Sequence, residues 1–364
     1  MDRFYECFQE IDDPRADNAR HELVEILFVA LLACLCGAKG CSDMAEFGRA
    51  KEGLLRRVLT LAHGVPSHDT FSRLFRLIDP KAFEAAFRRF TAAFAAAAGL
   101  ARPKGVVALD GKALRGAYER GRACMPRVMV TAWGAETRMT LACLEAEGGD
   151  EAGGALQLIA LLQLKGCVVT ADALHCHRAM AGAIRAQGGD YVIAVKGNQP
   201  ALLREAEAAL AASEKNAATA RAARKAHGRD ETREAIVASA GHMAGLHDFP
   251  GLVAVARVTS RRGADKPATR VFLLSRRFAP ERLLQIVRTH WDIENGQHWA
   301  LDVVFDEDGA RNRKDNGPAN LAVLRRMAMN IARAHPDPKT SLRRKLLRAG
   351  WDDKFLFELI RHMR

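Results

Sequence analysis

Two patterns of hydrophobic and polar residues divide the chain near residue 100. Over residues 1–100 the apolar residues recur every three or four positions, which is the spacing of helices that bury one face. From Lys104 onward, short apolar runs rich in β-branched residues alternate with helical patterns. This alternation predicts an α/β fold in which a mixed sheet is flanked by helices. Over residues 201–280 the alternation stops, and strand patterns there predict a β-rich insertion.

The boundaries of the predicted elements follow from these patterns. Strands are expected at Val106–Asp110, Arg127–Trp133, Met139–Glu145, Cys167–Ala171, Tyr191–Val195, Glu231–Ala238, Leu252–Thr259 and Arg270–Leu274. Helices after residue 100 are expected at Gly153–Leu164, His177–Gln187, Leu202–Ala223 and Glu281–Trp299. The predicted organisation is an N-terminal helical, candidate DNA-binding domain (1–100), the first part of a core (101–200), the β-rich insertion (201–280) and the second part of the core with a basic helical tail (281–364).

Two of the N-terminal helices form a candidate DNA-reading motif. One helix is predicted over Glu52–Leu61, ended by Gly64, and the next begins after Ser67, which is a candidate N-cap. A short turn between two helices is typical both of a helix-turn-helix and of an ordinary helical hairpin. In the first case polar residues of the second helix face DNA, namely His68, Asp69, Ser72, Arg73 and Arg76.

The charge of the chain is basic and uneven. Of 364 residues, 55 are Lys or Arg and 43 are Asp or Glu, which gives a formal net charge of +12. Residues 311–364 hold 14 of the basic residues and 5 of the acidic ones, so this segment alone supplies +9. A basic segment suits a DNA backbone because each neutralised phosphate releases counterions, although a solubilising surface has the same composition.

The sequence favours a reduced protein without membrane contact. Its 8 cysteines include no Cys-x-x-Cys pair, which argues against a zinc ribbon or a redox site. The segment Met1–Arg20 is polar and acidic, unlike a signal peptide, and the longest uncharged run, Ile26–Ala38, is too short to span a bilayer. The expected location is therefore the cytoplasm, in association with the nucleoid.

Three carboxylates far apart in the sequence form a candidate metal site. Asp110 and Asp172 end two strand patterns, and Glu294 lies on the predicted helix Glu281–Trp299. Ligands of open α/β sheets gather beyond the carboxyl ends of strands, where these residues can meet. Such carboxylates can hold two Mg²⁺ ions, with Mn²⁺ as a substitute, and two ions assist in-line phosphoryl displacement. A single strand-end aspartate is more typical of a turn or cap, so the interpretation depends on all three.

Six motifs in order along the chain support this interpretation. They are Leu109–Gly116, Leu164–Ala173, Gly189–Gln199, His227–Arg233, Arg288–Asn295 and Leu301–Asp308. Together they resemble the H-repeat-associated insertion-sequence transposases of the DDE type, and the resemblance extends over nearly the whole chain. It implies a ribonuclease-H-like core with a β-rich insertion. It also implies that Asp110, Asp172 and Glu294 are the catalytic, metal-binding triad.

The chain departs from the pattern of related transposases at one place. Those proteins often carry Tyr, Arg and Lys around the helix glutamate, where this chain has Val287, His290 and Leu301. Other residues of this chain can therefore make the phosphate contacts that Tyr, Arg and Lys make in those proteins. The candidate DNA-binding residues are Lys112, Arg115, Lys196, Asn198, Gln199, Arg233, His290, Arg311, Lys314, Arg73 and Arg76.

Several residues near Glu294 have more than one interpretation. His290, Glu294 and His298 share a helix face, which is compatible with a histidine ligand or with hydrogen bonding to Glu294 or substrate. Trp291 and Trp299 are expected in the core, with stacking on displaced bases as the alternative. A following acidic group is expected to be solvated or paired with the basic segment, namely Asp302, Asp306, Glu307 and Asp308.

The sequence thus predicts a DNA transposase. It is expected to cleave DNA at the terminal inverted repeats of a mobile element and to join the freed 3′-hydroxyl to target DNA, as a homodimer in the synaptic complex. Two alternatives stay open. One is a nuclease of the same fold that cleaves without joining, and the other is a domesticated or decayed transposase that acts as a non-catalytic DNA-binding protein.

Overall fold

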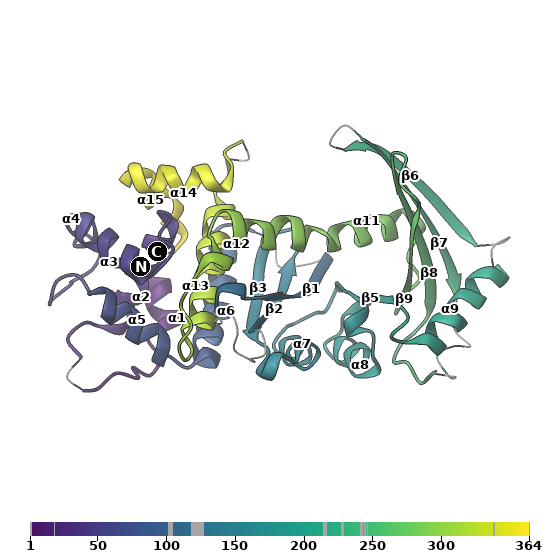
Figure 1. Cartoon of the computed structure of the whole chain (residues 1–364), viewed down its shortest axis with the longest axis horizontal. Coiled ribbons are helices and arrows are strands. Elements are labelled where there is room, and N and C mark those ends of the chain that lie inside the picture. The colour runs from purple at the N-terminus through teal and green to yellow at the C-terminus, as the bar shows by residue number, and fades with distance from the viewer. Residues whose placement is uncertain are drawn as a thin grey trace.

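One nine-stranded mixed sheet runs through the molecule, in the strand order β3-β2-β1-β4-β5-β9-β8-β7-β6. The computed structural model describes residues 2–17, 19–100, 105–117, 127–213, 217–226, 229–240, 243, 245, 247–337 and 339–363. Helices flank the sheet on both faces (Figure 1), which confirms the predicted α/β architecture. None of the helices in these residues combines the length and the apolar character needed to cross a bilayer.

The first five strands form the ribonuclease-H-like part of the sheet. They are β1 (Gly105–Ala113), β2 (Val128–Gly134), β3 (Met139–Glu145), β4 (Cys167–Ala171) and β5 (Asp190–Val195). Strands β1, β2 and β3 pair antiparallel, whereas β4 pairs parallel to β1 and β5 parallel to β4. All five residues of β4 are buried, as expected for a central parallel strand that is covered on both faces. The predicted ribonuclease-H-like fold is confirmed.

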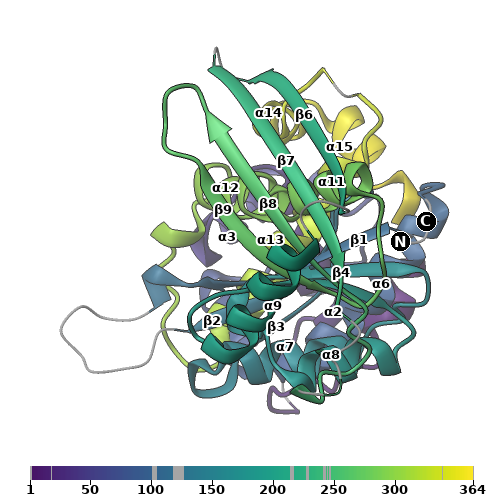
Figure 2. The same ribbon diagram turned by 90° about the vertical axis from the view of Figure 1, so that its right-hand side faces the viewer.

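The β-rich insertion continues this sheet. Its strands are β6 (Ala218–Ala226), β7 (Arg229–Ser239), β8 (Ala254–Arg262) and β9 (Ala268–Leu274), which pair antiparallel in sequence order (Figure 2). Strand β9 also pairs antiparallel with β5, with Leu274 opposite Val192. The inserted strands therefore belong to the same sheet as the core.

The predicted helix Leu202–Ala223 is wrong in its second half. Helix α9 spans Pro200–Ser213, and the chain from Ala218 onward forms strand β6. Alanine and arginine favour helices locally, but the β6 backbone pairs along its whole length with β7. Cross-strand pairing therefore overrides the local preference.

Helices cover the two faces of the core sheet. Helix α11 (Pro280–His290) lies on one face, where its buried Leu283 and Ile286 pack with valines of β1, β4 and β5. Helices α7 (Glu151–Ala160) and α8 (Arg178–Ala186) lie on the other face (Figure 1). The predicted helices Gly153–Leu164 and His177–Gln187 are thus present with shifted ends.

The N-terminal helices and the end of the chain share one hydrophobic core. The N-terminal helices are α1 (Asp2–Phe8), α2 (Leu23–Leu35), α3 (Cys41–Ala50), α4 (Glu52–Leu55), α5 (His68–Leu77) and α6 (Pro80–Ala97). The C-terminal helices are α13 (Gly317–Ala334), α14 (Leu342–Trp351) and α15 (Asp353–Leu359). Both ends of the chain lie in this helical region (Figure 1), where Arg3 donates a 3.1 Å hydrogen bond to the carbonyl of His362.

Helix α13 corrects the prediction of a basic tail. It packs against α2, α5, α6 and β3, and it is buried along nearly its whole length. Asn320 donates to the carbonyls of Phe75 and Ile78 at the end of α5, and Asn330 bonds both the N–H and the carbonyl of Thr140 in β3. The helix therefore ties the N-terminal helices to the core sheet.

The predicted pair of helices around Gly64 is also partly wrong. Helix α4 ends at Leu55, so residues 56–67, and not a short turn, separate it from α5. The carboxylate of Glu25 accepts hydrogen bonds from the backbone N–H groups of Thr60 and Leu61, which draws this part of the chain out of a helix. The N-cap prediction is confirmed, because the Ser67 hydroxyl accepts from the Thr70 N–H. A compact helix-turn-helix is not formed here.

Candidate active site

Asp110 and Asp172 lie beside each other because two parallel strands are in register. Ala108 of β1 pairs with Thr170 of β4, and each aspartate follows two residues later. Beyond Ala108, β1 leaves β4 but stays paired with β2 as far as Ala113, so the predicted strand end at Asp110 is wrong. Asp172 follows β4 directly, and its Oδ1 accepts the Leu174 N–H at 2.8 Å. The two carboxylates therefore flank the point at which the strands separate.

Glu294 stands on an irregular turn of the helix that crosses this edge. The predicted helix Glu281–Trp299 is present, but residues Ile293–His298 form a π-helical turn (η4) between α11 and α12 (Trp299–Val303). Such wider turns occur often at functional sites. Ile293 and Gln297 are buried while Glu294 is exposed, so the turn is anchored on one side and presents its carboxylate on the other. Arg333 of α13 donates a 2.6 Å hydrogen bond to the Gly296 carbonyl within the turn.

The pKa of Asp110 responds to the charges of the other two predicted triad residues. Burial raises the pKa of the Asp110 carboxyl to about 7, and the negative charges of Glu151, Glu294 and Asp172 contribute to the same increase. The Gly111 N–H donates to Asp110 and opposes this effect. The fold thus brings carboxylates from two strand ends and a distant helix within electrostatic range of each other.

Glu151 is a member of this cluster that sequence reasoning missed. It lies in the first turn of α7, and the predicted helix began two residues later, at Gly153. Gly111, which follows Asp110, makes room for it: a Cβ built there would lie 2.3 Å from the Glu151 Cδ. His175, in the short helix η3 (Ala173–His175), has its Nε2 3.3 Å from the Glu151 Oε1. The sequence signal that could have identified Glu151 is a glutamate at the start of a helix that follows a strand.

Two other histidines near the site are held in the neutral form. The His290 Nδ1 lies 3.0 Å from the Thr170 hydroxyl, and burial lowers the pKa of His290 to about 4. The His298 Nδ1 lies 3.6 Å from the Asp110 Oδ2, and burial lowers the pKa of His298 to about 3, with Arg326 and Lys112 lowering it further. His290 is thus bonded to β4, whereas His298 faces the Asp110 carboxylate.

The donor set fits hard divalent cations. It consists of carboxylate oxygens, which Mg²⁺ and Mn²⁺ prefer. Among the described residues, no lysine or arginine forms an ion pair with Asp110, Glu151, Asp172 or Glu294. The same part of the chain contains no ready-made group of three metal-binding side chains, so binding an ion would require these side chains to move together. The negative charge of this cluster is therefore left for a bound cation to balance.

A second acidic cluster close to the first is already neutralised. The Lys112 ammonium is buried and lies 2.7 Å from Asp302 and 2.8 Å from Asp308. Glu307, fully buried, accepts a 2.9 Å hydrogen bond from the equally buried Arg326. Of the acidic residues expected to be solvated or paired with the basic segment, Glu307 does pair with that segment through Arg326, whereas Asp302 and Asp308 pair with Lys112. The Lys112 ammonium, which was predicted to contact DNA, is thus engaged by carboxylates of the protein.

Asn198 and Gln199 hold the loop that follows Asp172. The Asn198 side chain donates a 2.7 Å hydrogen bond to the carbonyl of Ala173, and Gln199 donates to the carbonyl of Cys176 at 3.1 Å. These bonds tie the end of β5 to the segment after β4. Lys196, in the same loop, is exposed.

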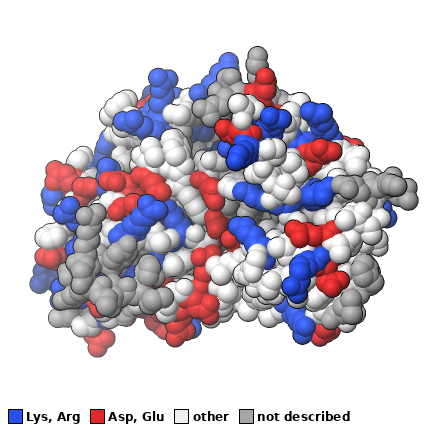
Figure 3. All heavy atoms as spheres, turned by 45° about the vertical axis from the view of Figure 1, so that its right-hand side comes forward, with Lys and Arg blue, Asp and Glu red and all other residues white. Residues whose placement is uncertain are grey.

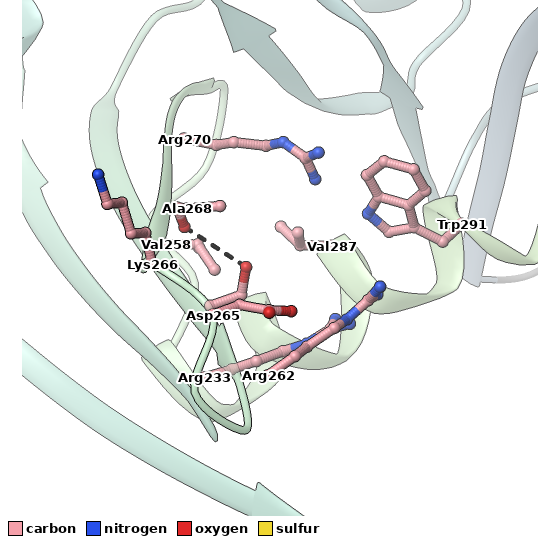
Figure 4. Close-up of a pocket in the computed structure, with 10 residues that line it drawn as sticks. Arg233, Val258, Arg262, Asp265, Lys266, Ala268, Arg270, Val287 and Trp291 are labelled. Atoms are coloured by element: carbon pink, nitrogen blue, oxygen red, sulfur yellow. Dashed lines mark hydrogen bonds between the residues drawn. The ribbon is translucent and has the colours of Figure 1, made fainter. Parts of the chain in front are cut away.

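A basic pocket separates the inserted strands from the helix that carries Glu294. Trp291 and Arg270 form one wall, where the Arg270 Cζ lies 4.3 Å from the indole ring centroid (Figure 4). Burial lowers the pKa of Arg270, whereas the Glu294 charge raises it. Trp291 therefore lines a pocket, and Trp299 is 57% exposed, so the expectation that both lie in the core is wrong. The remaining charged residues of the lining are Arg233, Arg262, Asp265 and Lys266.

The other predicted DNA contacts lie on the surface. Arg115 is largely exposed, 3.7 Å from Asp308, and Arg311 and Lys314 are exposed near the end of the same acidic segment. On α5, Arg73 is exposed and Arg76 forms a 2.6 Å ion pair with Asp315. Basic side chains lie on both sides of a band of acidic side chains on one face of the molecule (Figure 3). Two residues of the motif His227–Arg233, His227 and Gly228, lie outside the described residues.

Comparison with known proteins gives consistent matches. A family described as "Transposase DDE domain" matches residues 101–331, and one described as "DDE_Tnp_1-associated" matches residues 5–91. The chain is 41% identical over 261 residues to "Uncharacterized protein in dhlA 3'region" of Xanthobacter autotrophicus, covering 70% of this chain and 87% of that one. It is 29% identical over 356 residues to "H repeat-associated putative transposase YhhI" of Escherichia coli (strain K12), covering 94% and 93%. The piggyBac transposase in a synaptic complex with hairpin DNA matches at 12% identity with a TM-score of 0.48, over the whole of this chain and 80% of that one.

Proposed function

Because the chain belongs to the transposases that carry a DDE domain, we propose that it cleaves DNA at the ends of a mobile element and joins the freed 3′-hydroxyl to target DNA. The observation that carries the proposal is the convergence of Asp110, Asp172 and Glu294 around the separating ends of β1 and β4. These three residues are the proposed catalytic and metal-binding triad. The substrate is DNA that contains the terminal repeats of the element.

The proposed cofactor is a pair of Mg²⁺ ions held by the triad, with Mn²⁺ as a substitute. Bound there, the ions supply activation of the attacking hydroxyl and charge stabilisation at the attacking and leaving oxygens of an in-line displacement. The protein contributes positioning. The register of β1 and β4 fixes the two aspartates, and the anchored π turn presents the glutamate.

The neutral histidines have positioning roles in this proposal. A neutral imidazole can donate one hydrogen bond, and His298 is placed to donate from Nδ1 to the Asp110 carboxylate. His290 is held by Thr170, the last residue of β4 but one, so it links the helix to the strand that carries Asp172. Neither residue needs to change its charge at neutral pH, because burial keeps both pKa values well below 7.

The basic pocket beside Glu294 is the proposed binding site for a DNA phosphate backbone. Arg233, Arg262, Lys266 and Arg270 surround it, against one lining carboxylate, Asp265. Guanidinium groups bind phosphate oxygens through paired hydrogen bonds. Val287 and Trp291, close before Glu294 in the sequence, line the pocket (Figure 4). A strand held there therefore passes close to Glu294, whose charge acts on Arg270. We propose that two chains act together, since both ends of an element must be processed in one complex.

A strand-cleavage assay on end-containing DNA tests the proposal. Asp110→Asn and Glu294→Gln are expected to lower Mg²⁺-dependent cleavage by roughly 10³-fold or more, because charge stabilisation carries most of phosphoryl transfer. Glu281→Gln, on the exposed first turn of α11, is the matched control and should cleave like the wild type. Full cleavage by Asp110→Asn would remove the triad assignment.

The products of the same assay separate the alternatives. Joined strands identify a transposase, whereas cut strands without joining identify a nuclease of the same fold. DNA binding without any Mg²⁺- or Mn²⁺-dependent cleavage identifies a decayed, non-catalytic protein.

A further inference from the structure

A fourth carboxylate lies close to Asp110 outside the proposed triad, and a buried histidine lies against that carboxylate. The carboxylate belongs to Glu151, whose backbone is fixed at the start of α7 because the Asp150 side chain accepts the Gly153 N–H at 3.0 Å. Its side chain is 23% exposed and occupies the space that Gly111 leaves free. Glu151 therefore lies directly against the residue that follows Asp110.

His175 is buried on the other side of the Glu151 carboxylate. The imidazole has no exposed surface, and its Nε2 lies 3.3 Å from the Glu151 Oε1. Within the described part of the chain, neither ring nitrogen makes a hydrogen bond. Burial of a polar ring without hydrogen bonds costs free energy, so its position needs a compensating group. The group that the ring faces is Glu151, and both lie next to the segment that begins at Asp172.

The charge around Glu151 is not balanced by protein cations. Over the described ranges, no lysine or arginine forms an ion pair with it. Among the charged neighbours that raise the pKa of Asp110, Glu151 has the largest effect, ahead of Glu294. Two divalent cations carry four positive charges, whereas the triad supplies three negative charges. Glu151 supplies the fourth.

We propose that Glu151 is a fourth carboxylate ligand for the hard divalent cations at this site, and that His175 positions it. The inference rests on the proposed function in one respect, the use of Mg²⁺ or Mn²⁺ by the triad. A carboxylate in a ligand role must be held by neighbouring groups, and the His175 ring, with Nε2 3.3 Å from the Glu151 Oε1, is placed to do this. Gly111 is then required because any side chain there would displace the carboxylate.

A purely structural role for Glu151 makes a different prediction. A glutamate in a first helical turn interacts favourably with the helix dipole, and the pair with His175 adds a contact. In that case a change at Glu151 alters the stability of the fold and leaves cation binding unchanged. The two roles are therefore separated by a direct measurement of cation binding.

The experiment is a Mn²⁺ titration of the full chain, with free Mn²⁺ followed by electron paramagnetic resonance. Glu151→Gln is expected to weaken Mn²⁺ binding by roughly tenfold or more, since even indirect partners of metal ligands contribute that much. Glu147→Gln, four residues earlier and exposed, is the matched control and should titrate like the wild type. A Glu151→Gln titration that overlaps the wild-type curve would overturn the proposal. If Glu151→Gln does not fold, Glu151→Ala takes its place and is judged by the same comparison.

The positioning role of His175 has its own readout. His175→Leu removes the N–H donor and should weaken Mn²⁺ binding, whereas His175→Gln keeps a donor and should restore most of it. Equal loss of thermal stability in both variants, with Mn²⁺ affinity unchanged, would show that His175 only fills space.

Asp110→Asn in the same titration separates a failure of the fourth-ligand proposal from a failure of the proposed function. If Asp110→Asn weakens Mn²⁺ binding and Glu151→Gln does not, the fourth ligand is rejected while the proposed function stands. If neither variant changes Mn²⁺ binding, the metal-dependent function itself is rejected.

Discussion

Asp110 and Lys112, two residues apart on strand β1, each lie in a group of acidic side chains. The two groups differ in how their negative charge is balanced. Around Lys112, the three carboxylates of Asp302, Glu307 and Asp308 meet three cations, which are Lys112 and Arg326 inside the protein and Arg115 at its surface. Around Asp110, the carboxylates meet histidines, and among the described residues no lysine or arginine pairs with them. The first cluster needs nothing from outside, whereas the second has negative charge left over. An acidic cluster without internal cations is thus the better indicator of a cation site.

The largest effect on stability is expected in the balanced cluster. Glu307→Gln would leave Arg326 buried without its counter-charge, and breaking a buried ion pair costs about 3–5 kcal/mol. Urea unfolding should show this loss in the presence and in the absence of Mg²⁺. Asp306→Asn, in the exposed pair with Lys39, is the control and should change the free energy of unfolding by less than about 1 kcal/mol. An unchanged midpoint for Glu307→Gln would contradict the assignment of this cluster to structure.

An effect of opposite sign is expected in the unbalanced cluster. The pKa of Asp110 is about 7 in the folded chain against an ordinary value of 3.8, so between these pH values the folded state binds a proton that the unfolded state has released. The stability contributed by the protonated group is present below about pH 4 and is lost as the pH rises through 7. In EDTA, Asp110→Asn should therefore be more stable than the wild type at pH 8, by on the order of 3 kcal/mol, and the gain should vanish near pH 4.

This pH comparison has a clear failing outcome. Urea unfolding at pH 8 and at pH 4 gives the two free energies for each protein. A variant that is less stable than the wild type at pH 8 would show that the negative charge of Asp110 is compensated in the folded protein, and the contrast between the clusters would disappear.

The smallest effect concerns Arg270, which lies near Glu294 without pairing with it. If the pocket holds a phosphate, Arg270→Gln should weaken DNA binding by about 1 kcal/mol and reduce the salt dependence of binding by about one unit. Fluorescence anisotropy at several salt concentrations measures both. Arg282→Gln, exposed on α11, is the control. A large loss of protein stability in Arg270→Gln would instead make Arg270 a partner of the acidic cluster.

Much of the fold could be predicted because strand positions carry strong local signals. The apolar runs at β1, β4 and β5 and their alternation with helices predict the parallel part of the sheet, and the register follows once the strands pair. Strand β6 was missed because its alanines and arginines favour a helix locally, and only pairing with β7 makes it a strand. The buried helix α13 was read as a basic tail because the partners of its arginines lie outside the helix: Arg325 donates to the carbonyl of Lys39, and Arg326 pairs with Glu307.

The candidate site, like the fold, could be predicted only in part. Asp110, Asp172 and Glu294 were predicted from two strand patterns and a helix pattern, and the family resemblance implied the same three residues, although β1 continues past Asp110 to Ala113. Glu151 was missed because its proximity to Asp110 depends on the absence of a side chain at Gly111, which no periodicity reveals. Lys112 appeared to be a DNA contact because its three acidic partners come from a segment almost two hundred residues later.

The bonds made by α13 have a consequence for damaged copies of the gene. This one helix is hydrogen-bonded to the end of α5, to β3 and to the turn that carries Glu294. A frameshift or stop codon before residue 317 would therefore remove the support of all three at once. Such a truncated product is expected to be degraded, and it is not expected to persist as a smaller nuclease.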